Sequence, residues 1–262
     1  MRIGFIGFGN MARAIYEGLT EYGNFKKENF LVAVKSENSK NRLKEEGFKV
    51  LSIKGVVENS DLIFVAVKPK DAKKVLEEIS KVLKEQILVS VMAGISLERL
   101  ENSLLSGAKV VRTMPNINVS VGKGIWGVTY GRNISKEERE KVKEILSLTG
   151  LVLEIEEHLM DSITALAGSG PAFVSEIIDA FAQAGVKLGF PYKEALKIAL
   201  YTFGGTVENL LQKEEHPIIY RDKVTSPAGT TIYGLSKLNS EGIKGKLMEA
   251  LEESFRRAKG LI

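Results

Sequence analysis

The chain has 262 residues, a net charge of +4 and 44% hydrophobic residues, enough to bury a core and to form two domains. It has no cysteine and only two histidines, which excludes disulfides, thiolate catalysis and cysteine–zinc sites and leads us to expect no metal. The basic residues are interleaved with Asp and Glu, so we expect no nucleic-acid surface. There is no signal-peptide pattern and no apolar run of membrane-spanning length, so we expect a cytoplasmic protein that does not enter a membrane.

The first residues of the chain carry the most informative motif of the sequence. Ile3–Ile6 is apolar and predicts a buried strand, and Ala12–Leu19 continues at helical spacing. Between them lies Gly-x-Gly-x-x-Ala, the phosphate-binding turn of a dinucleotide fold. Gly7 permits the tight turn, Gly9 lets the backbone approach a pyrophosphate, and the helix N-terminus offers unpaired N–H groups. A plain glycine-rich turn is the alternative, but the position between strand and helix favours a nucleotide.

The second predicted strand, Phe30–Val34, bears on which dinucleotide is bound. An acidic residue at the end of this strand typically bonds the ribose hydroxyls of NAD. Here the strand leads into Lys35-Ser36, a cation and a hydroxyl that favour a 2′-phosphate and hence NADPH. Glu37 follows at once and keeps NADH open as the alternative. The alternative to a 2′-phosphate site is that Lys35 is an ordinary solvated charge.

Strands and helices continue to alternate up to about residue 158. This alternation predicts an α/β domain with a doubly wound, mainly parallel sheet, a Rossmann-type fold. Ligands of such sheets bind beyond the carboxyl ends of the strands, where Ala66-Val67-Lys68-Pro69 and Ala93-Gly94 lie. The alternative for Lys68 is that it is a surface lysine with no role in binding. The further strands are expected at Phe48–Leu51, Asp61–Val67, Ile87–Val91, Lys109–Thr113, Gly124–Tyr130 and Leu151–Ile155, with helices at Asp71–Leu83 and Lys136–Leu148.

From residue 159 onward only helical periodicity remains. We therefore expect a dinucleotide-binding domain over 1–158 and an all-α domain over 159–262. Gly168–Pro171 should form a kink or a loop, and Ile243–Lys259 a final amphipathic helix. The predicted helices Ala172–Leu188 and Tyr192–Leu211 are apolar on more than one face. A domain of this size cannot bury them alone, so we expect a subunit interface there.

One segment of the helical half has the composition of a binding loop. Val224–Thr231 combines hydroxyls, a proline and a glycine ahead of an apolar helix. Ser226 is expected to cap that helix and Pro227 to lie in its first turn, which exposes N–H groups to a carboxylate. A plain N-cap explains Ser226 and Pro227, but it leaves Gly229 and the Thr230-Thr231 pair unexplained, because these residue types begin helices poorly.

Taken in order, these motifs resemble the pyrroline-5-carboxylate reductase family over essentially the whole chain. The resemblance implies a Rossmann domain followed by a helical dimerisation domain, and hydride transfer from NAD(P)H to an imino-acid substrate to give L-proline. It also implies a homodimer through the helical domain, with a decamer built from dimers as a further alternative. It rests on Gly4–Ala12, Ala66–Pro69, Ala93-Gly94, Met114-Pro115-Asn116, Gly168–Ala172 and Ser226–Thr231.

The resemblance also implies the site residues. Substrate would bind Ser226, Gly229, Thr230 and Thr231, with Glu214 nearby, and Thr231 would be the catalytic residue that hydrogen-bonds the ring nitrogen. The cofactor would lie on Ile6, Gly7, Phe8, Gly9, Asn10, Met11, Lys35, Ser36, Ala66, Val67, Lys68, Pro69, Ala93 and Gly94.

The chain departs from the family's usual pattern at four places. Ala228 stands where the binding loop usually has glycine, which would cost roughly 1–2 kcal/mol if the position needs a positive φ. Ile53 replaces an asparagine that contacts ribose, Ile117-Asn118 replaces Thr-Pro, and Asp179 replaces a glutamate. The Ala228 change bears on substrate fit and the Ile53 change on cofactor affinity.

Two other functions are alternatives for this layout. A β-hydroxyacid dehydrogenase shares the layout but uses a helix lysine as proton donor, and Gly168–Ile178 contains none; Lys187 lies more than two helical turns beyond it. A non-catalytic NADP-binding regulator should have lost the Ser226–Thr231 loop, which is largely intact. Turnover with NADPH and an imine separates an enzyme from a regulator.

Overall fold

The computed structural model describes residues 1–260, and their contacts group them into two units. One unit contains Met1–Ser169 together with the described residues from 254 onward, and the other contains Gly170–Glu253. The C-terminal end of the expected helical domain, residues 261–262, lies outside the described residues. The strands are β1 (Ile3–Ile6), β2 (Phe30–Ala33), β3 (Lys49–Val50), β4 (Leu62–Val65), β5 (Ile87–Ser90), β6 (Lys109–Pro115), β7 (Gly124–Tyr130) and β8 (Gly150–Glu154).

The helices follow the strands in the first unit and make up the second. Those of the first 169 residues are α1 (Asn10–Tyr22), α2 (Glu37–Glu45), α3 (Ile53–Glu58), α4 (Ala72–Ser80), α5 (Leu97–Asn102), α6 (Lys136–Ser147) and α7 (Met160–Ile163). Those that follow are α8 (Gly170–Lys187), α9 (Tyr192–Lys213), α10 (Pro217–Lys223), α11 (Thr230–Ser240) and α12 (Ile243–Lys259).

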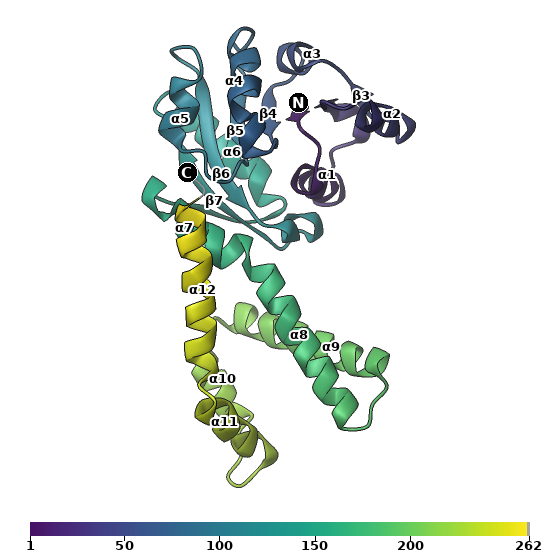
Figure 1. Cartoon of the computed structure of the whole chain (residues 1–262), viewed down its shortest axis with the longest axis vertical. Coiled ribbons are helices and arrows are strands. Elements are labelled where there is room, and N and C mark those ends of the chain that lie inside the picture. The colour runs from purple at the N-terminus through teal and green to yellow at the C-terminus, as the bar shows by residue number, and fades with distance from the viewer. Residues whose placement is uncertain (261–262) are drawn as a thin grey trace. The chain divides into compact units, whose positions relative to one another are not determined.

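The sheet has the strand order β3-β2-β1-β4-β5-β6-β7-β8. Figure 1 shows the sheet and labels β3, β4, β5, β6 and β7. The pairs are parallel except β6 with β7, so the predicted doubly wound, mainly parallel sheet is confirmed. The chain passes outward from β1 through β2 to β3 and then returns to the other side of β1 as β4. The β1–β4 boundary is therefore the topological switch point, the place where sheets of this type bind ligands.

The two faces of the sheet carry separate hydrophobic clusters, because successive side chains of a strand point to opposite faces. Helices α1 and α6 cover one face, and α3, α4 and α5 cover the other. On the first face the fully buried Phe5 stacks on Phe30 and on Phe64, which are also fully buried. The opposite face is filled by aliphatic residues such as Ile63 and Leu88. Apolar residues on both sides of the central strands explain their nearly continuous hydrophobic sequence.

The second unit is built around a close contact between α8 and α9. A seam of small residues, Ala182, Ala195 and Ala199, is buried between the two helices. A Cβ on Gly185 would lie 2.7 Å from the Cβ of Ala195, so glycine is what permits the approach. Phe181 packs edge-to-face on Phe203, with ring centroids 4.9 Å apart.

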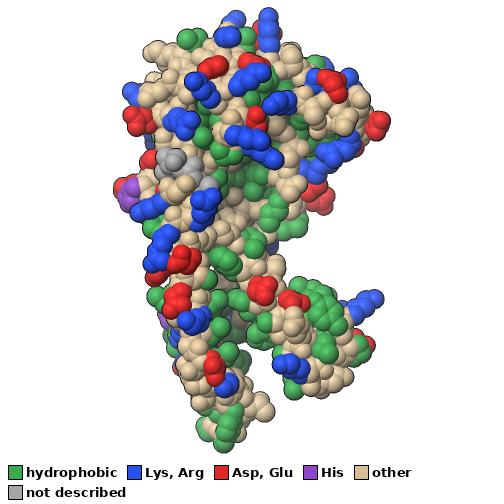
Figure 2. Space-filling model, in the orientation of Figure 1, with side chains coloured by type: hydrophobic (Ala, Val, Ile, Leu, Met, Phe, Trp, Pro, Cys, Tyr) green, Lys and Arg blue, Asp and Glu red, His purple; other side chains and the backbone are tan. Residues whose placement is uncertain are grey.

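Large hydrophobic side chains remain exposed on this pair of helices. Leu188 is 81% exposed and Tyr201 is 76% exposed, and Figure 2 shows hydrophobic side chains gathered on the surface of the helical unit. The others on α8, α9 and their connection are Val174, Phe181, Val186, Phe190, Tyr192, Ile198, Leu200, Val207 and Leu211. Exposed apolar residues in this number are typical of an interaction surface, which the sequence pattern predicted for these helices.

Some boundaries differ from the sequence predictions. Strand β4 ends at Val65 rather than at the predicted Val67, and Pro69 opens a 3₁₀ turn beyond it. Helix α11 begins at Thr230 with Gly229 as its N-cap, so Ser226 is not the cap and Pro227 is not in the first turn. The predicted kink at 168–171 is preceded by a π-helical turn, Thr164–Gly168, after which α8 begins at once.

We predict that Thr149→Val destabilises the sheet unit by about 1–3 kcal/mol, the usual cost of leaving a buried polar group unpaired. Thr149 is fully buried, and its Oγ1 accepts a hydrogen bond from Trp126 Nε1 at 2.9 Å. Valine has the same shape but no acceptor. Urea unfolding followed by fluorescence of Trp126, the single tryptophan, measures the change. Thr20→Val, at an exposed position of α1, is the control and should change the free energy by less than about 0.5 kcal/mol.

Candidate functional site

The predicted cofactor residues of β1 and β4 come together at the switch point. The Ala66 N–H donates to the Ile6 carbonyl at 2.8 Å, and the Gly7 N–H donates to the Ala33 carbonyl at 2.8 Å. The β1–α1 turn is thus fixed against the ends of both neighbouring strands. The side chains of Ile6 and Phe8 are buried in the core, so these two residues can face a ligand only through their backbone.

Gly7 and Gly9 have different structural roles. Gly7 has φ +86°, and a Cβ there would lie 2.5 Å from the Ala66 carbonyl oxygen. Only glycine satisfies both conditions. Gly9 has an ordinary φ of −86°, and a Cβ on it would meet no atom within 4 Å. Gly9 is therefore not required by the packing of the chain, whereas open space beside a backbone is what a bound pyrophosphate needs.

The N-terminus of α1 faces this open space. Gly9 is the N-cap, and no side chain caps the helix. The first N–H groups of a helix, here those of Asn10 and Met11, have no intrahelical partner and attract anions. A 13-residue helix that begins without an acidic residue and without a side-chain cap keeps these donors available for phosphate. The turn therefore fits the dinucleotide that the sequence predicts.

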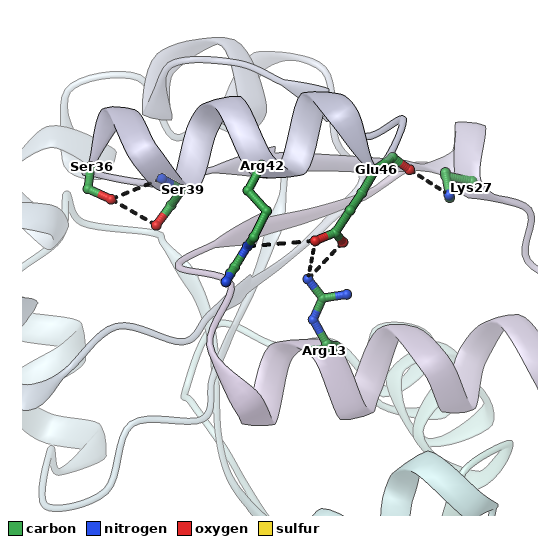
Figure 3. Close-up of polar contacts among 6 residues, drawn as sticks. All are labelled: Arg13, Lys27, Ser36, Ser39, Arg42 and Glu46. Carbon is green, nitrogen blue, oxygen red and sulfur yellow. Dashed lines mark hydrogen bonds and ion pairs between the residues drawn. The ribbon is translucent and has the colours of Figure 1, made fainter.

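The end of β2 presents Lys35 and Ser36 to solvent. Lys35 is 85% exposed at its side chain and forms an ion pair with Asp71 at 3.3 Å. Ser36 caps α2 by accepting the Ser39 N–H at 3.2 Å, and its hydroxyl donates to Ser39 Oγ (Figure 3). Glu37, the residue that kept NADH open, is bound by Lys40 at 2.6 Å, and this hydrogen bond holds the pKa of the Glu37 carboxyl below its ordinary value.

At the opposite end of α2, Glu46 joins this helix to α1 (Figure 3). Its carboxylate accepts from Arg13 at 2.8 Å and lies 3.6 Å from Arg42 Nε, while its carbonyl accepts from Lys27 (Figure 3). Arg42 therefore forms an exposed ion pair at the C-terminal end of α2, between two residues one helical turn apart. Arg13 was not predicted; its guanidinium also lies over the Phe8 ring, 5.4 Å from the centroid.

The remaining predicted cofactor residues follow β4 and β5 at the same edge of the sheet. Val67 lies beside the β1–α1 turn, since its Cγ1 would be 2.9 Å from a Cβ on Gly7. Lys68 and Pro69 lead into the 3₁₀ turn that ends at Asp71, the partner of Lys35. No local pattern links Asp71 to Lys35, which precedes it by 36 residues, so sequence reasoning missed this contact. Gly94 has φ +72°, a backbone conformation that favours glycine.

The predicted substrate residues lie in the second unit. The Gly229 N–H donates to the Ser226 carbonyl at 3.1 Å, which closes a four-residue turn with Pro227 and Ala228 at its centre. Ala228 has φ +56°, so this position does require the left-handed conformation that alanine adopts only at a cost. A Cβ on Gly229 would lie 2.3 Å from Ser226 Oγ, so the serine hydroxyl lies directly against the glycine backbone.

This turn delivers the chain directly into α11. The helix has no side-chain cap, so the N–H groups of Thr230 and Thr231 are left for another acceptor. The Gly229 N–H, by contrast, already serves the turn. Thr231 is half-buried, whereas Ser226 and Thr230 are exposed. Glu214 has φ +49° at the C-terminus of α9 and precedes Glu215, which is held by Lys223 of α10.

The departure at Asp179 is structurally accommodated. The Asp179 carboxylate accepts hydrogen bonds from the Tyr192 hydroxyl at 2.6 Å and from Gln183 Nε2 at 2.5 Å. The Tyr192 hydrogen bond, followed by that of Gln183, holds the pKa of Asp179 below its ordinary value. The residue thus links α8 to the start of α9.

Within the part of the chain that the structure describes, no helix is long and apolar enough to cross a membrane. Among the same residues, no group of three or more histidine or acidic side chains is placed to hold a metal ion.

The fold and the dinucleotide turn define the chain as an NAD(P)H-dependent oxidoreductase. Residues 2–94 match the family model described as NADP oxidoreductase, coenzyme F420-dependent, and residues 157–261 match that of pyrroline-5-carboxylate reductase dimerisation. The chain is 45% identical to pyrroline-5-carboxylate reductase of Aquifex aeolicus, over 100% of this chain and 97% of that protein.

Solved structures agree with these matches over the full length. The pyrroline carboxylate reductase of Plasmodium falciparum with NADP bound has a TM-score of 0.90 and 30% identity, covering 100% of this chain and 98% of that one. The Streptococcus pyogenes enzyme has a TM-score of 0.88 and 32% identity, covering 99% and 98%. The chain belongs to the pyrroline-5-carboxylate reductase family, as the sequence motifs predicted.

We predict that Gly9→Ala weakens NADPH binding at least about ten-fold, while the stability changes by less than about 1 kcal/mol. The new methyl group would enter only the space next to the α1 N-terminus. Titration calorimetry with NADPH and thermal unfolding measure the two effects.

Gly7→Ala is the matched comparison for Gly9→Ala. Its Cβ would clash with the Ala66 carbonyl, and the positive φ alone costs roughly 1–2 kcal/mol, so this variant should unfold at a lower temperature. Unchanged NADPH affinity in folded Gly9→Ala would contradict the placement of phosphate at this turn.

Proposed function

We propose that the chain reduces 1-pyrroline-5-carboxylate to L-proline with NADPH as the preferred donor, the last step of proline biosynthesis. The observation that carries this proposal is that one chain retains both the dinucleotide turn at Gly7–Gly9 and the Ser226–Thr231 loop, in a full-length match to reductases of this name. A hydroxyacid dehydrogenase does not require such a loop, and a regulator has no reason to keep it.

The loop suits a small carboxylate. Two successive N–H groups at the start of α11, from Thr230 and Thr231, point along the helix axis, and the helix dipole adds a partial positive charge there. The turn at Ala228 brings Ser226 Oγ alongside, so that a hydroxyl can donate to the same anion. Gly229 contributes by lacking a Cβ, which keeps the approach to these groups open. Glu214 is proposed to lie near the bound substrate.

Thr231 is the proposed catalytic residue. When bound, the nicotinamide supplies a hydride, and the acceptor is the carbon of a cyclic imine. A protonated imine accepts hydride readily and takes its proton from water near neutral pH, so the protein needs orientation and an anion site rather than a strong acid. The Thr231 hydroxyl holds the ring nitrogen in place, next to the N–H groups that hold the carboxylate. Reduction places the hydride on carbon and leaves the nitrogen as the secondary amine of proline.

The preference for NADPH rests on the end of β2. Lys35 and Ser36 are proposed to bind the 2′-phosphate, the lysine by charge and the serine by its hydroxyl. The Lys35–Asp71 ion pair is exposed, so it can exchange for a phosphate at little cost. Glu37, bound by Lys40, is withdrawn from the role that an acidic residue plays toward NAD.

The oligomeric state follows from the exposed apolar surface of α8 and α9. We propose a homodimer through the helical domain, with a decamer of such dimers as the larger alternative. Residues such as Leu188 and Tyr201 would lose their exposure on association. We also propose that the boundary between the two domains lies at 158/159, which the dimerisation match beginning at residue 157 supports. A cytoplasmic location is part of the same proposal.

We predict that Thr231→Ala lowers kcat/KM for the imine by at least about ten-fold, the effect of losing a hydrogen bond to a charged group. NADPH oxidation at 340 nm with pyrroline-5-carboxylate measures it, and Thr231→Ser, which keeps the hydroxyl, is the matched control.

Absence of turnover in a folded wild-type protein that binds NADPH would contradict the reductase activity. Full activity of Thr231→Ala would leave the proposed reductase activity intact. It would mean that solvent, and not Thr231, supplies the hydrogen bond to the ring nitrogen.

We predict that Lys35→Ala raises KM for NADPH about ten-fold and changes KM for NADH by less than about two-fold, because only NADPH carries the 2′-phosphate. Steady-state kinetics with both cofactors measure the ratio. Lys143→Ala, an exposed lysine of α6, is the control for a general charge effect. An equal change for the two cofactors would contradict the assignment of Lys35.

A further inference from the structure

An ion pair between the buried Arg112 and the half-buried Glu157 lies in the sheet unit, apart from the residues assigned above. Arg112 is on β6 and only 5% exposed, and its Nη1 donates to Glu157 Oε1. Glu157 opens the 3₁₀ turn Glu157–Leu159 that follows β8. A buried guanidinium is costly unless it is paired, so Arg112 fixes the position of the carboxylate.

The same carboxylate oxygen has a second donor. The Leu97 N–H, at the first residue of α5, lies 2.9 Å from Glu157 Oε1. The other oxygen, Oε2, is buried and has no hydrogen-bond partner among the described residues. One oxygen atom therefore joins three segments that are distant in sequence: β6, the start of α5 and the chain after β8.

The loop from Val91 to Ser96 is held between two fixed ends. At its beginning, the Val91 N–H continues the sheet ladder by donating to the Val65 carbonyl at 3.1 Å. At its end, Ser96 caps α5 and Leu97 is bound by Glu157. Between these points lie Ala93 and Gly94, the residues proposed to face the nicotinamide half of the cofactor. Loss of the Glu157 contact would remove the hydrogen bond that ties the α5 end of this loop to β6 and to the chain after β8, and would leave the Val91 end in place.

The adenosine half is proposed to bind elsewhere. Lys35 and Ser36 follow β2, which is separated from β5 by β1 and β4 in the sheet. A change at the β5–α5 loop should therefore affect one half of the dinucleotide and spare the other.

We propose that Glu157, held by Arg112, is a positioning residue that sets the β5–α5 loop for the nicotinamide half of the cofactor. This inference rests on the proposed function for the placement of the dinucleotide. It assigns to a glutamate outside the predicted site a role in cofactor geometry, which acts through Leu97 and the loop backbone rather than by contact with the reacting atoms.

The test compares two ligands by titration calorimetry. NADPH carries both halves of the dinucleotide, and 2′,5′-ADP carries the adenosine half alone. Glu157→Ala should raise the Kd of NADPH about ten-fold and that of 2′,5′-ADP by less than about two-fold. Glu157→Gln should restore the NADPH affinity, because an amide oxygen still accepts the Leu97 N–H. With the imine, Glu157→Ala should lower kcat more than it raises KM for the imine.

Two further variants keep the test decisive. Glu156→Ala removes the exposed neighbouring carboxylate, which pairs with His158 at 3.2 Å, and should leave both affinities unchanged. If Glu157→Ala does not fold, Glu157→Asp keeps the charge beside Arg112 but is too short to hold both donors, and should show the same selective loss. If the wild type prefers NADH, NADH and ADP replace the two ligands.

Equal loss for the two ligands, or loss for neither, overturns the proposal. The first result would mean that Glu157 only stabilises the fold. The second would mean that the loop keeps its geometry without Glu157. Ligand binding needs no imine reduction, so a wild type that binds NADPH without turnover would refute the proposed function and still leave the selective loss measurable.

Discussion

The β1–α1 turn has to pass directly against the end of β4, and the arrangement of the site depends on this contact. A Cβ on Gly7 would be 2.5 Å from the Ala66 carbonyl oxygen, and the residue adopts φ +86°. Both conditions restrict the position to glycine. Because the turn is this tight, the N-terminus of α1 opens at the switch point, where the ends of β2, β4 and β5 also arrive. The cofactor residues are thus gathered by topology rather than by contacts among their side chains.

The helical unit is governed by a different constraint. Its helices pack on one another through small residues, Ala182 with Ala195 and Ala199, and this close approach leaves the large apolar side chains on the outside. A seam of alanines buries little apolar area, so the unit has a limited core of its own. Exposed apolar residues such as Leu188 and Tyr201 are typical of an interaction surface, which agrees with the match of residues 157–261 to a dimerisation family.

Much of the fold was predictable, because the patterns that determine it are local. The strands β1, β2 and β5 are short runs of buried apolar residues, and α12 begins and ends where its periodicity predicts. The short helices α3, α5 and α10 gave no comparable signal, since six or seven residues hold fewer than two helical turns. The start of α11 was misplaced because capping propensity favours Ser226, whereas the positive φ of Ala228 forms a turn that delays the helix to Thr230.

The candidate site was likewise predictable only in part. The glycines of the dinucleotide turn and the residues after β4 were predictable, since their spacing carries the chemistry. The partners of those residues were not: Asp71 binds Lys35, and Glu157 binds Arg112 and Leu97, across separations of 36 to 60 residues. Contacts of this kind depend on sheet order and helix placement, which a one-dimensional pattern does not contain. The roles of Ser226–Thr231 came from a family resemblance rather than from spacing.

The most direct test of the account follows the hydride itself. The wild-type protein is incubated with pyrroline-5-carboxylate and with NADPH deuterated at both C4 positions, and the product is examined by mass spectrometry and NMR. The account predicts L-proline one mass unit heavier than normal, with deuterium at the ring carbon of the former imine. Unlabelled proline, or no oxidation by a folded protein that binds NADPH, would contradict it.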